Sequence, residues 1–289
     1  MEVTPRYDLA VIGGGPAGAS AAWAAAQRGL RVALLERGAF PRDKVCGEFV
    51  SHEALPLLQR MAPELVAAAP TIASAAFVSA SGRRAEFRLP QPARGISRLA
   101  LDATLWQAAG AAGAHLLPRS PVTAVARADG GFELAMGTGA RLAVSAVIVA
   151  AGRWWRLQGL ETPASAAGPW IGVKARFRGL EPRAAVEMYA FRGGYCGLAA
   201  VENGWVNACC LVHRRCAGEL VASRDFAAWI GAVSRSRPLI ERLRPGAQAT
   251  ATVVTAPVAM GAHTAVRAGV WLAGDAAGFI DPFTGDGLA

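Results

Sequence analysis

Six residues near the start of the chain, Gly13-Gly14-Gly15-Pro16-Ala17-Gly18, have the G-x-G-x-x-G spacing of a dinucleotide-binding turn, and they directly follow the apolar run Tyr7 to Ile12. In this pattern Gly13 allows a tight turn out of the strand, and Gly15 lets the backbone approach a pyrophosphate. Gly18 lets the following helix pack closely on the strand. A spacing of this kind alone is weak support for a ligand, so its sequence context matters.

The context of the turn favours a bound dinucleotide over a plain structural turn. Pro16 and Ala17 open an alanine-rich segment, and the free N–H groups at the start of a helix favour an anion. Glu36 ends the next apolar strand, 21 residues after Gly15, where an acid can hydrogen-bond a ribose diol. Taken one at a time, the glycines could be ordinary turn residues and Glu36 an ordinary surface residue.

A second glycine-rich segment near the other end of the chain, Gly274 to Gly287, follows the apolar run Gly269 to Ala273. Asp275 ends a predicted strand, where its carboxylate can accept hydrogen bonds from ribityl hydroxyls. Residues 281–287 are predicted to begin a helix whose N–H groups face the flavin pyrimidine edge, which stabilises negative charge there by about 1 kcal/mol. An NAD(P) domain needs no such segment, so the pair predicts FAD held from both ends of the sequence. An Asp N-cap before a terminal helix is the alternative.

Composition predicts a globular chain that does not bind nucleic acid. The 289 residues are 53% hydrophobic and 18% charged, and the apolar runs are shorter than the roughly 18 residues of a membrane span. No signal peptide is recognisable at the N-terminus, so a cytoplasmic location is predicted. The arginines behind the net charge of +9 are scattered, which disfavours a nucleic-acid partner. Peripheral association with anionic lipid, or attraction of a phosphorylated substrate, stays open as an alternative.

The five cysteines show neither a redox pair nor a metal pattern. Cys46, Cys196, Cys209, Cys210 and Cys216 contain no C-x-x-C and no zinc spacing. The sequence therefore predicts no metal site and argues against disulfide reductase chemistry.

The predicted fold class is α/β, with an FAD-binding Rossmann-like domain that carries a mixed sheet and a β-meander, and an inserted, mostly antiparallel β substrate domain. The FAD-binding domain is predicted at 1–70, 96–165 and 262–289, and the substrate domain at 71–95 and 166–261. Single helices are expected over Ser51–Ala62 and Asp225–Leu243.

Together these segments resemble the FAD-dependent oxidoreductases of the glutathione-reductase superfamily, with the p-hydroxybenzoate-hydroxylase type of FAD fold and specifically the geranylgeranyl-reductase-like branch. The resemblance covers nearly the whole chain and also rests on Pro41–Ser51 and Ile96–Asp102. Lys44-Val45-Cys46-Gly47 is its most branch-specific part. The residues that the glycine patterns and the resemblance assign to FAD are Gly13, Gly15, Pro16, Ala17, Gly18, Glu36, Arg37, Lys44, Cys46, Gly47, Arg98, Ala151, Gly152, Gly274, Asp275, Pro282, Gly285 and Gly287.

The chain departs from patterns of the related enzymes. Ala150–Trp155 lacks the Asp-Gly pair of aromatic hydroxylases, and Gly194–Ala200 replaces the Tyr-x-Trp-x-Phe-Pro segment of isoprenoid reductases. No Trp-x-Trp-x-Ile-Pro element is present, which disfavours a halogenase. Relatives continue beyond Ala289, so a fragment or a truncated product is expected.

The resulting functional hypothesis is a flavin-dependent oxidoreductase that reduces a C=C bond of an apolar, isoprenoid-like or polyketide-like substrate. NAD(P)H or another electron donor would visit the FAD transiently, because no second G-x-G-x-x-G exists. Tyr195 and Cys46 are weak catalytic candidates, for which packing is the alternative role. An aromatic monooxygenase and a truncated, non-catalytic flavin-binding protein are the alternative functions. The oligomeric state is not predicted.

Overall fold

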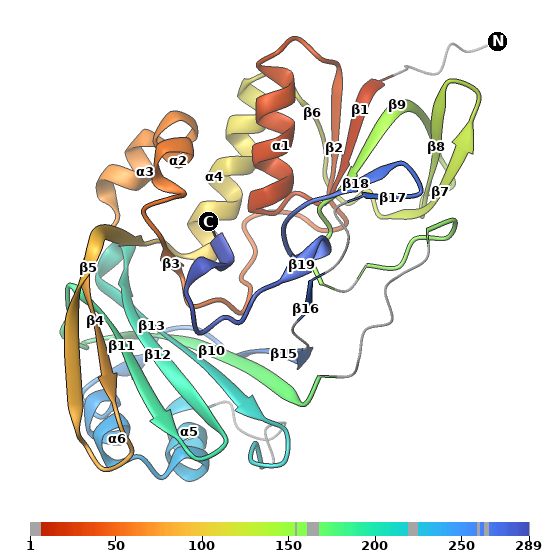
Figure 1. Cartoon of the computed structure of the whole chain (residues 1–289). Helices are drawn as coiled ribbons and strands as arrows, with labels where there is room; N and C mark the ends of the chain where they lie inside the picture. The colour runs from red at the N-terminus through yellow and green to blue at the C-terminus, as the bar shows by residue number, and fades with distance from the viewer. Residues whose placement is uncertain are drawn as a thin grey trace. The chain divides into compact units, whose positions relative to one another are not determined.

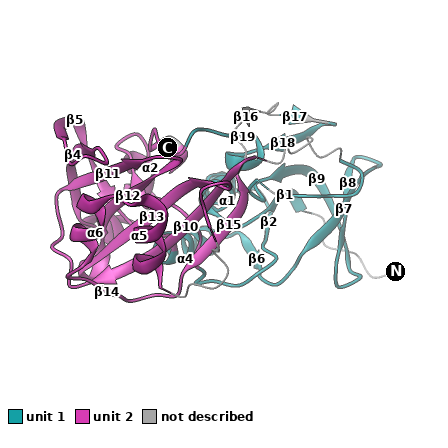
Figure 2. Ribbon diagram, turned by 90° about the horizontal axis from the view of Figure 1, so that it is seen from below, with its two compact units in different colours: residues 1–42, 99–165, 260–281 teal, residues 43–98, 166–259, 282–289 magenta. Residues whose placement is uncertain are grey.

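The computed structural model describes residues 7–153, 155–160, 168–218, 225–258, 261–262 and 266–288 (Figure 1). The chain forms two compact units, which Figure 2 colours separately. Unit 1 contains residues 1–42, 99–165 and 260–281, and unit 2 contains residues 43–98, 166–259 and 282–289. Both units are α/β in content, which confirms the predicted fold class.

Unit 1 is built on a mixed sheet with the order β17-β18-β9-β1-β2-β6. Strands β18, β9, β1, β2 and β6 run parallel to one another, whereas the edge strand β17 pairs antiparallel with β18. Strand β2 is an unbroken apolar run, and β1 is apolar and buried from Leu9 to Ile12, as expected for strands covered on both faces. The strands are β1 (Tyr7–Ile12), β2 (Val32–Leu35), β6 (His115–Leu117), β9 (Arg141–Val149), β17 (Val266–Arg267) and β18 (Val270–Leu272).

The predicted meander and helices complete unit 1. Strands β7 (Val122–Ala128) and β8 (Gly131–Met136) pair antiparallel with each other, and β8 pairs in the same way with β9. Helix α1 (Pro16–Ala26) begins at a proline, whose missing N–H would have no partner in the first turn of a helix. Helix α4 (Arg98–Ala111) buries Leu101, Leu105 and Trp106. Short segments are η3 (Gly274–Ala276), β16 (Gly261–Ala262) and β19 (Gly278–Phe279).

Unit 2 is built on a nine-stranded sheet with the order β14-β10-β13-β12-β11-β4-β5-β3, and β15 also pairs with β10. Among these described strands every pair is antiparallel except β11 with β4. The strands are β3 (Phe49–Val50), β4 (Thr71–Val78), β5 (Arg84–Gly95), β10 (Trp170–Arg178), β11 (Ala185–Phe191), β12 (Gly194–Val201), β13 (Trp205–His213), β14 (Ala247–Gln248) and β15 (Val253–Val258).

Helices α5 (Phe226–Ser234) and α6 (Arg237–Leu243) cover one face of this sheet, where Phe226, Trp229 and Leu239 join its apolar core. The prediction of one helix over Asp225–Leu243 is wrong. The chain turns at Arg235, whose φ is +48°, and Pro238 lies in the first turn of α6 and cannot continue a preceding helix.

The predicted helix over Ser51–Ala62 is shorter than expected. Helix α2 (Leu55–Met61) has Pro56 in its first turn, and α3 (Pro63–Ala68) follows as a separate helix. Two 3₁₀ segments, η1 (Glu202–Gly204) and η4 (Asp286–Leu288), complete the described elements of unit 2. Residues 281–287, predicted to begin a helix, form only this 3₁₀ turn within the described part.

Segments 43–70, 96–98 and 282–289 group with unit 2, whereas the sequence assigns them to the FAD-binding domain. The physical reason is that β3 pairs with β5, and Phe283 packs against Phe77 of β4. Across the described ranges, no helix combines the length and the apolar character that crossing a bilayer requires.

Candidate cofactor site

Four segments that are far apart in the sequence meet at one edge of the parallel sheet of unit 1 (Figure 1). Parallel strands bring their carboxyl ends to the same edge, where α/β proteins bind ligands. Gly13–Gly15 follows β1, Glu36 follows β2, Ala151–Gly152 follows β9, and Gly274 follows β18. The structure therefore gathers the unit 1 part of the predicted cofactor residues.

The first glycine turn is packed so closely that it excludes side chains. A Cβ added to Gly13, whose φ is +107°, would lie 2.4 Å from the carbonyl oxygen of Ala150. A Cβ added to Gly18 would lie 1.8 Å from the carbonyl oxygen of Gly13. Both neighbours are backbone atoms, so they cannot rotate away. Steric exclusion therefore accounts for the glycines at both ends of the motif.

The second glycine segment lies directly against the first helix. Gly274 has a φ of +59°, and a Cβ added there would lie 2.7 Å from the Cβ of Ala17. Ala17 stands in the first turn of α1, at the helix start that the sequence assigns to a pyrophosphate. The two ends of the chain thus meet at the carboxyl edge of the sheet.

Two aromatic rings, which the sequence analysis did not single out, fix the back of the turn. A Cβ added to Gly14 would lie 2.4 Å from the ring of Trp106 and 3.1 Å from that of Phe40. The centroids of these two rings are 5.3 Å apart. Trp106 is visible in the sequence as a buried helix position, but its contact with the turn depends on the tertiary fold.

Glu36 is almost fully buried and receives hydrogen bonds from the turn. Its Oε2 accepts from the backbone N–H of Gly14 at 3.0 Å, and its Oε1 accepts from that of Gly38 at 2.9 Å and from Nη2 of Arg42 at 3.1 Å. The Nε of Arg42 is a buried donor with no hydrogen-bond acceptor.

Asp275 has a partner that the sequence analysis did not predict. The Nε of Arg153 lies 3.9 Å from Oδ2 of Asp275, and the guanidinium lies 4.3 Å from the ring centroid of Phe279. Arg153 belongs to Ala150–Trp155, the segment that lacks the Asp-Gly pair of aromatic hydroxylases. A basic residue at the carboxyl end of β9 is the signal that could have identified it.

The branch-specific Lys44–Gly47 segment lies in unit 2 and is held by the sheet of that unit. Nδ2 of Asn207 on β13 donates to the carbonyl oxygens of Cys46 and Gly47, each at 3.0 Å. The half-buried Sγ of Cys46 accepts from the backbone N–H of Glu48 at 3.4 Å. These bonds define the local path of the segment without assigning a catalytic role to Cys46.

The segment Pro282–Leu288 also packs within unit 2. The ring of Phe283 lies 5.3 Å from that of Tyr195, edge to face, and 5.6 Å from that of Phe77. A Cβ added to Gly285, whose φ is +83°, would lie 3.1 Å from the ring of Phe49. Tyr195 thus has the packing contact that was the alternative to catalysis.

The remaining predicted residues differ in their surroundings. Arg37 is exposed on the loop after β2, Arg98 is half-buried, and a Cβ added to Gly287 would meet nothing within 4 Å. The backbone N–H of Arg98 donates to Oε1 of Glu48 at 2.7 Å. Pro282 is half-buried at the start of the C-terminal segment.

Cys209 and Cys210 point to opposite faces of β13, as their adjacency predicts. Cys210 faces Cys196 in the apolar core, whereas Cys209 is opposite Lys174. Burial raises the pKa of both thiols above the ordinary value, and the neighbouring cysteines raise it further. Among the described residues, no three His, Cys, Asp or Glu side chains are placed to hold a metal ion.

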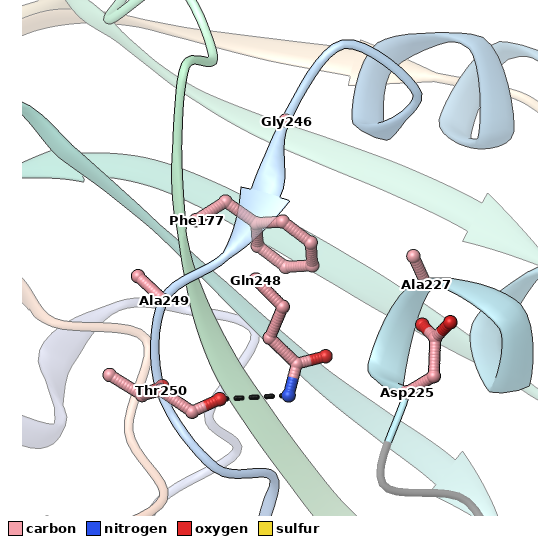
Figure 3. Close-up of a pocket in the computed structure, with 7 residues that line it drawn as sticks. All are labelled: Phe177, Asp225, Ala227, Gly246, Gln248, Ala249 and Thr250. Atoms are coloured by element: carbon pink, nitrogen blue, oxygen red, sulfur yellow. Dashed lines mark hydrogen bonds between the residues drawn. The ribbon is translucent and has the colours of Figure 1, made fainter.

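A shallow pocket of about 510 Å³ in unit 2 lies beside helix α5 (Figure 3). Its lining residues are Phe177, Asp225, Ala227, Gly246, Gln248, Ala249 and Thr250. The side chain of Gln248 forms local hydrogen bonds: it accepts from the N–H of Phe226 and donates to the carbonyl oxygen of Thr250. None of the predicted cofactor residues lines this pocket.

Comparison with known proteins identifies the class. Residues 7–175 match the family model "Pyridine nucleotide-disulphide oxidoreductase", and the chain belongs to that family. A menaquinone reductase of Mycolicibacterium smegmatis is 26% identical over 98% of this chain and 73% of its own length. A geranylgeranyl diphosphate reductase of Rhodobacter capsulatus is 38% identical over 39% of this chain and 28% of its own length.

Solved structures share the fold over 98% of this chain. A geranylgeranyl bacteriochlorophyll reductase-like protein of Thermoplasma acidophilum has a TM-score of 0.77 at 22% identity, with 75% of that chain covered. The myxobacterial chondrochloren halogenase, an FAD-dependent enzyme, has a TM-score of 0.76 at 23% identity, with 71% of that chain covered. The family model and the sequence relatives, with these structures sharing the fold, confirm the predicted relationship to FAD-dependent oxidoreductases of the geranylgeranyl-reductase type.

Proposed function

We propose that this chain binds FAD and uses it to reduce a C=C bond in an apolar substrate of isoprenoid-like or polyketide-like structure. The observation that carries the proposal is the gathering of Gly13–Gly15, Glu36, Ala151–Gly152 and Gly274 at one sheet edge. The relatives add the substrate class, since two of them are named as reductases of menaquinone and of geranylgeranyl diphosphate. Both compounds carry an unsaturated isoprenoid chain.

The residues of unit 1 fit a dinucleotide in their chemistry. The N-cap of α1 is Gly15, so no side chain blocks the N–H groups at the start of this helix, and they can bind a pyrophosphate. Glu36 would accept from a ribose hydroxyl, and the unpaired Nε of Arg42 would serve an anionic oxygen. Asp275, oriented by Arg153, would accept from ribityl hydroxyls.

The resemblance assigns further cofactor contacts to Lys44, Cys46, Gly47, Arg98, Pro282, Gly285 and Gly287. Bound FAD supplies the hydride chemistry. The chain contributes the apolar side chains of Phe77 and Tyr195 on one face of the sheet of unit 2, and of Phe283 packed against them, where an apolar substrate can shed its water. Tyr195 remains a candidate proton donor, and NAD(P)H or another donor would reduce the flavin transiently.

The first test is the visible spectrum of the purified chain, with the released cofactor identified. The proposal expects stoichiometric FAD. Reduced protein should then convert geranylgeranyl diphosphate to a product heavier by two hydrogens, without oxygen. Product that forms only with oxygen and carries an oxygen atom would instead support the monooxygenase alternative. A chain that takes up no FAD would overturn the proposal and leave the non-catalytic alternative.

A further inference from the structure

Four charged side chains form a closed cluster beneath the Asp43–Glu48 segment of unit 2. Lys174 and Arg176 project from the same face of β10, because they are two residues apart in a strand. Asp43 and Glu48 stand at the two ends of the segment. The side chains of Lys174 and Glu48 are 0% exposed, that of Arg176 is 1% exposed and that of Asp43 is 20% exposed. Two positive and two negative charges balance.

Glu48 is the acceptor on which the cluster converges. Its Oε1 accepts from Nζ of Lys174 at 2.5 Å and from Nη2 of Arg176 at 2.6 Å. The same oxygen also accepts from the backbone N–H of Arg98 at 2.7 Å, and Oε2 accepts from Nε of Arg176 at 3.1 Å. One carboxylate therefore joins β10, the Asp43–Glu48 segment and Arg98.

Asp43 closes the other end of the cluster. Its Oδ1 accepts from Nζ of Lys174 at 2.7 Å, and both terminal nitrogens of Arg176 donate to its carboxylate at 2.9 Å. Lys174 also donates to the carbonyl oxygen of Lys44 at 3.0 Å. Burial by itself would raise the pKa of Asp43, but Lys174 and Arg176 outweigh burial and hold that pKa below its ordinary value. Both ends of the segment are thus bonded to β10.

The backbone of the segment adopts a conformation that this cluster must enforce. Glu48 has a φ of +60°, in the left-handed region that non-glycine residues rarely adopt. Its carbonyl oxygen accepts from the N–H of Ile96 at 3.0 Å. A strained residue of this kind persists where its surroundings over-determine it, and such residues gather at functional sites.

We propose that Lys174 and Arg176 are positioning residues, which act through Glu48 and Asp43 to hold Cys46, Gly47 and the N–H of Arg98 in the conformation that receives the cofactor. That the segment receives a cofactor rests on the proposed function. That the cluster orders the Asp43–Glu48 segment does not depend on it. Asn207 on β13 adds to this support, because its Nδ2 donates to the carbonyl oxygens of Cys46 and Gly47.

A second buried charge cluster in unit 2 provides the matched comparison. Glu187 on β11, with a side chain 2% exposed, accepts from Nη1 of Arg183 at 2.5 Å and from Nε of Arg242 at 2.9 Å. The register pairs Glu187 with Leu198, which belongs to the apolar core on the helix-covered face. Glu187 therefore lies on the opposite face from Lys174 and does not contact the Asp43–Glu48 segment.

The test compares two charge-neutral double variants of the full chain. Glu48→Gln with Lys174→Met leaves Arg176 paired with Asp43, and Glu187→Gln with Arg242→Met is the control. The first readout is the rate at which a maleimide labels Cys46 in the FAD-free protein, resolved by mass spectrometry of the Cys46 peptide. The second readout is the dissociation constant for FAD, and circular dichroism establishes that both variants are folded.

The inference expects the Glu48/Lys174 variant to label Cys46 at least tenfold faster and to bind FAD at least tenfold more weakly, while the control stays within twofold of the parent for both. A folded Glu48/Lys174 variant with parental labelling of Cys46 overturns the inference, whatever the FAD result. If this variant does not fold, Arg176→Lys, which keeps the charge but loses the fork of donors, takes its place with the same criteria. A parent chain that binds no FAD overturns the proposed function instead, and the labelling result still decides the inference.

Discussion

The glycine edge of unit 1 and the charged segment of unit 2 fix their backbones by opposite physical means. At the edge, Gly13, Gly18 and Gly274 leave out side chains, and a Cβ would meet its neighbours at 1.8–2.7 Å. In the segment, Glu48 is held in a strained conformation by buried charges from β10. Adding an atom to the closely packed edge lowers stability, whereas the charge cluster loses stability when one charge is removed without its partner. The two regions should therefore fail in different ways.

Removing one charge should have the largest effect. Lys174→Met leaves two buried carboxylates with one guanidinium, and breaking a buried pair costs about 4 kcal/mol of unfolding free energy. Glu48→Gln in the same chain should restore part of that loss because neutrality returns. Chemical denaturation measures both. Arg237→Met, which breaks the exposed pair with Glu241, is the control and should change stability little. An equally small effect of Lys174→Met would contradict the importance of the cluster.

Adding one methyl group at the glycine edge should have the next largest effect. Gly18→Ala places a Cβ 1.8 Å from a backbone carbonyl, so we expect a loss of about 3 kcal/mol in unfolding free energy and poor retention of FAD. Gly231→Ala in α5 is the matched control, since its Cβ would lie 3.6 Å from Ile240 and alanine favours a helix. If both variants unfold alike, close packing does not fix the edge.

The contact between the two glycine segments should show as coupling. Gly274→Ala places a methyl group 2.7 Å from the Cβ of Ala17 and strains a residue with a φ of +59°, at a cost of about 2 kcal/mol. Ala17→Gly removes the contact but leaves the strain. A double-mutant cycle should therefore give a coupling free energy of about 1 kcal/mol. Strict additivity would mean that the segments do not touch.

Lowering the pH should have the smallest effect on the free energy of unfolding, and it should affect only the charged segment. The pKa of Asp43 is lowered in the folded chain, so its stabilisation is complete above the ordinary value of 3.8 and is lost as the pH falls through the lower, folded value. The difference in unfolding free energy between the parent and Asp43→Asn should shrink below about pH 4. The difference between the parent and Gly18→Ala should not change in that range. A constant Asp43→Asn difference down to pH 2 would show that the charge of Asp43 does not matter.

The contrast also explains what could be read before the structure was known. The strand–turn–helix–strand pattern predicted β1, α1 and β2, because glycine spacing and apolar runs are local properties. The single helix expected over Asp225–Leu243 was wrong, although Pro238 was a visible warning. Lys44 and Cys46 were singled out by resemblance, yet the residue that organises their segment, Glu48, was passed over.

The sequence by itself determined the class of the protein, since Gly13–Gly18 and Gly274–Gly287 carry conformational requirements that few other residue types meet. It also determined which strands are apolar enough to be central. Only the tertiary structure decided which charges pair. Lys174 and Glu48 are 126 residues apart, and no local period announces such a pair. Their contact exists because sheet register and burial bring them together where water cannot compete, and there an unpaired charge costs far more free energy than a balanced cluster.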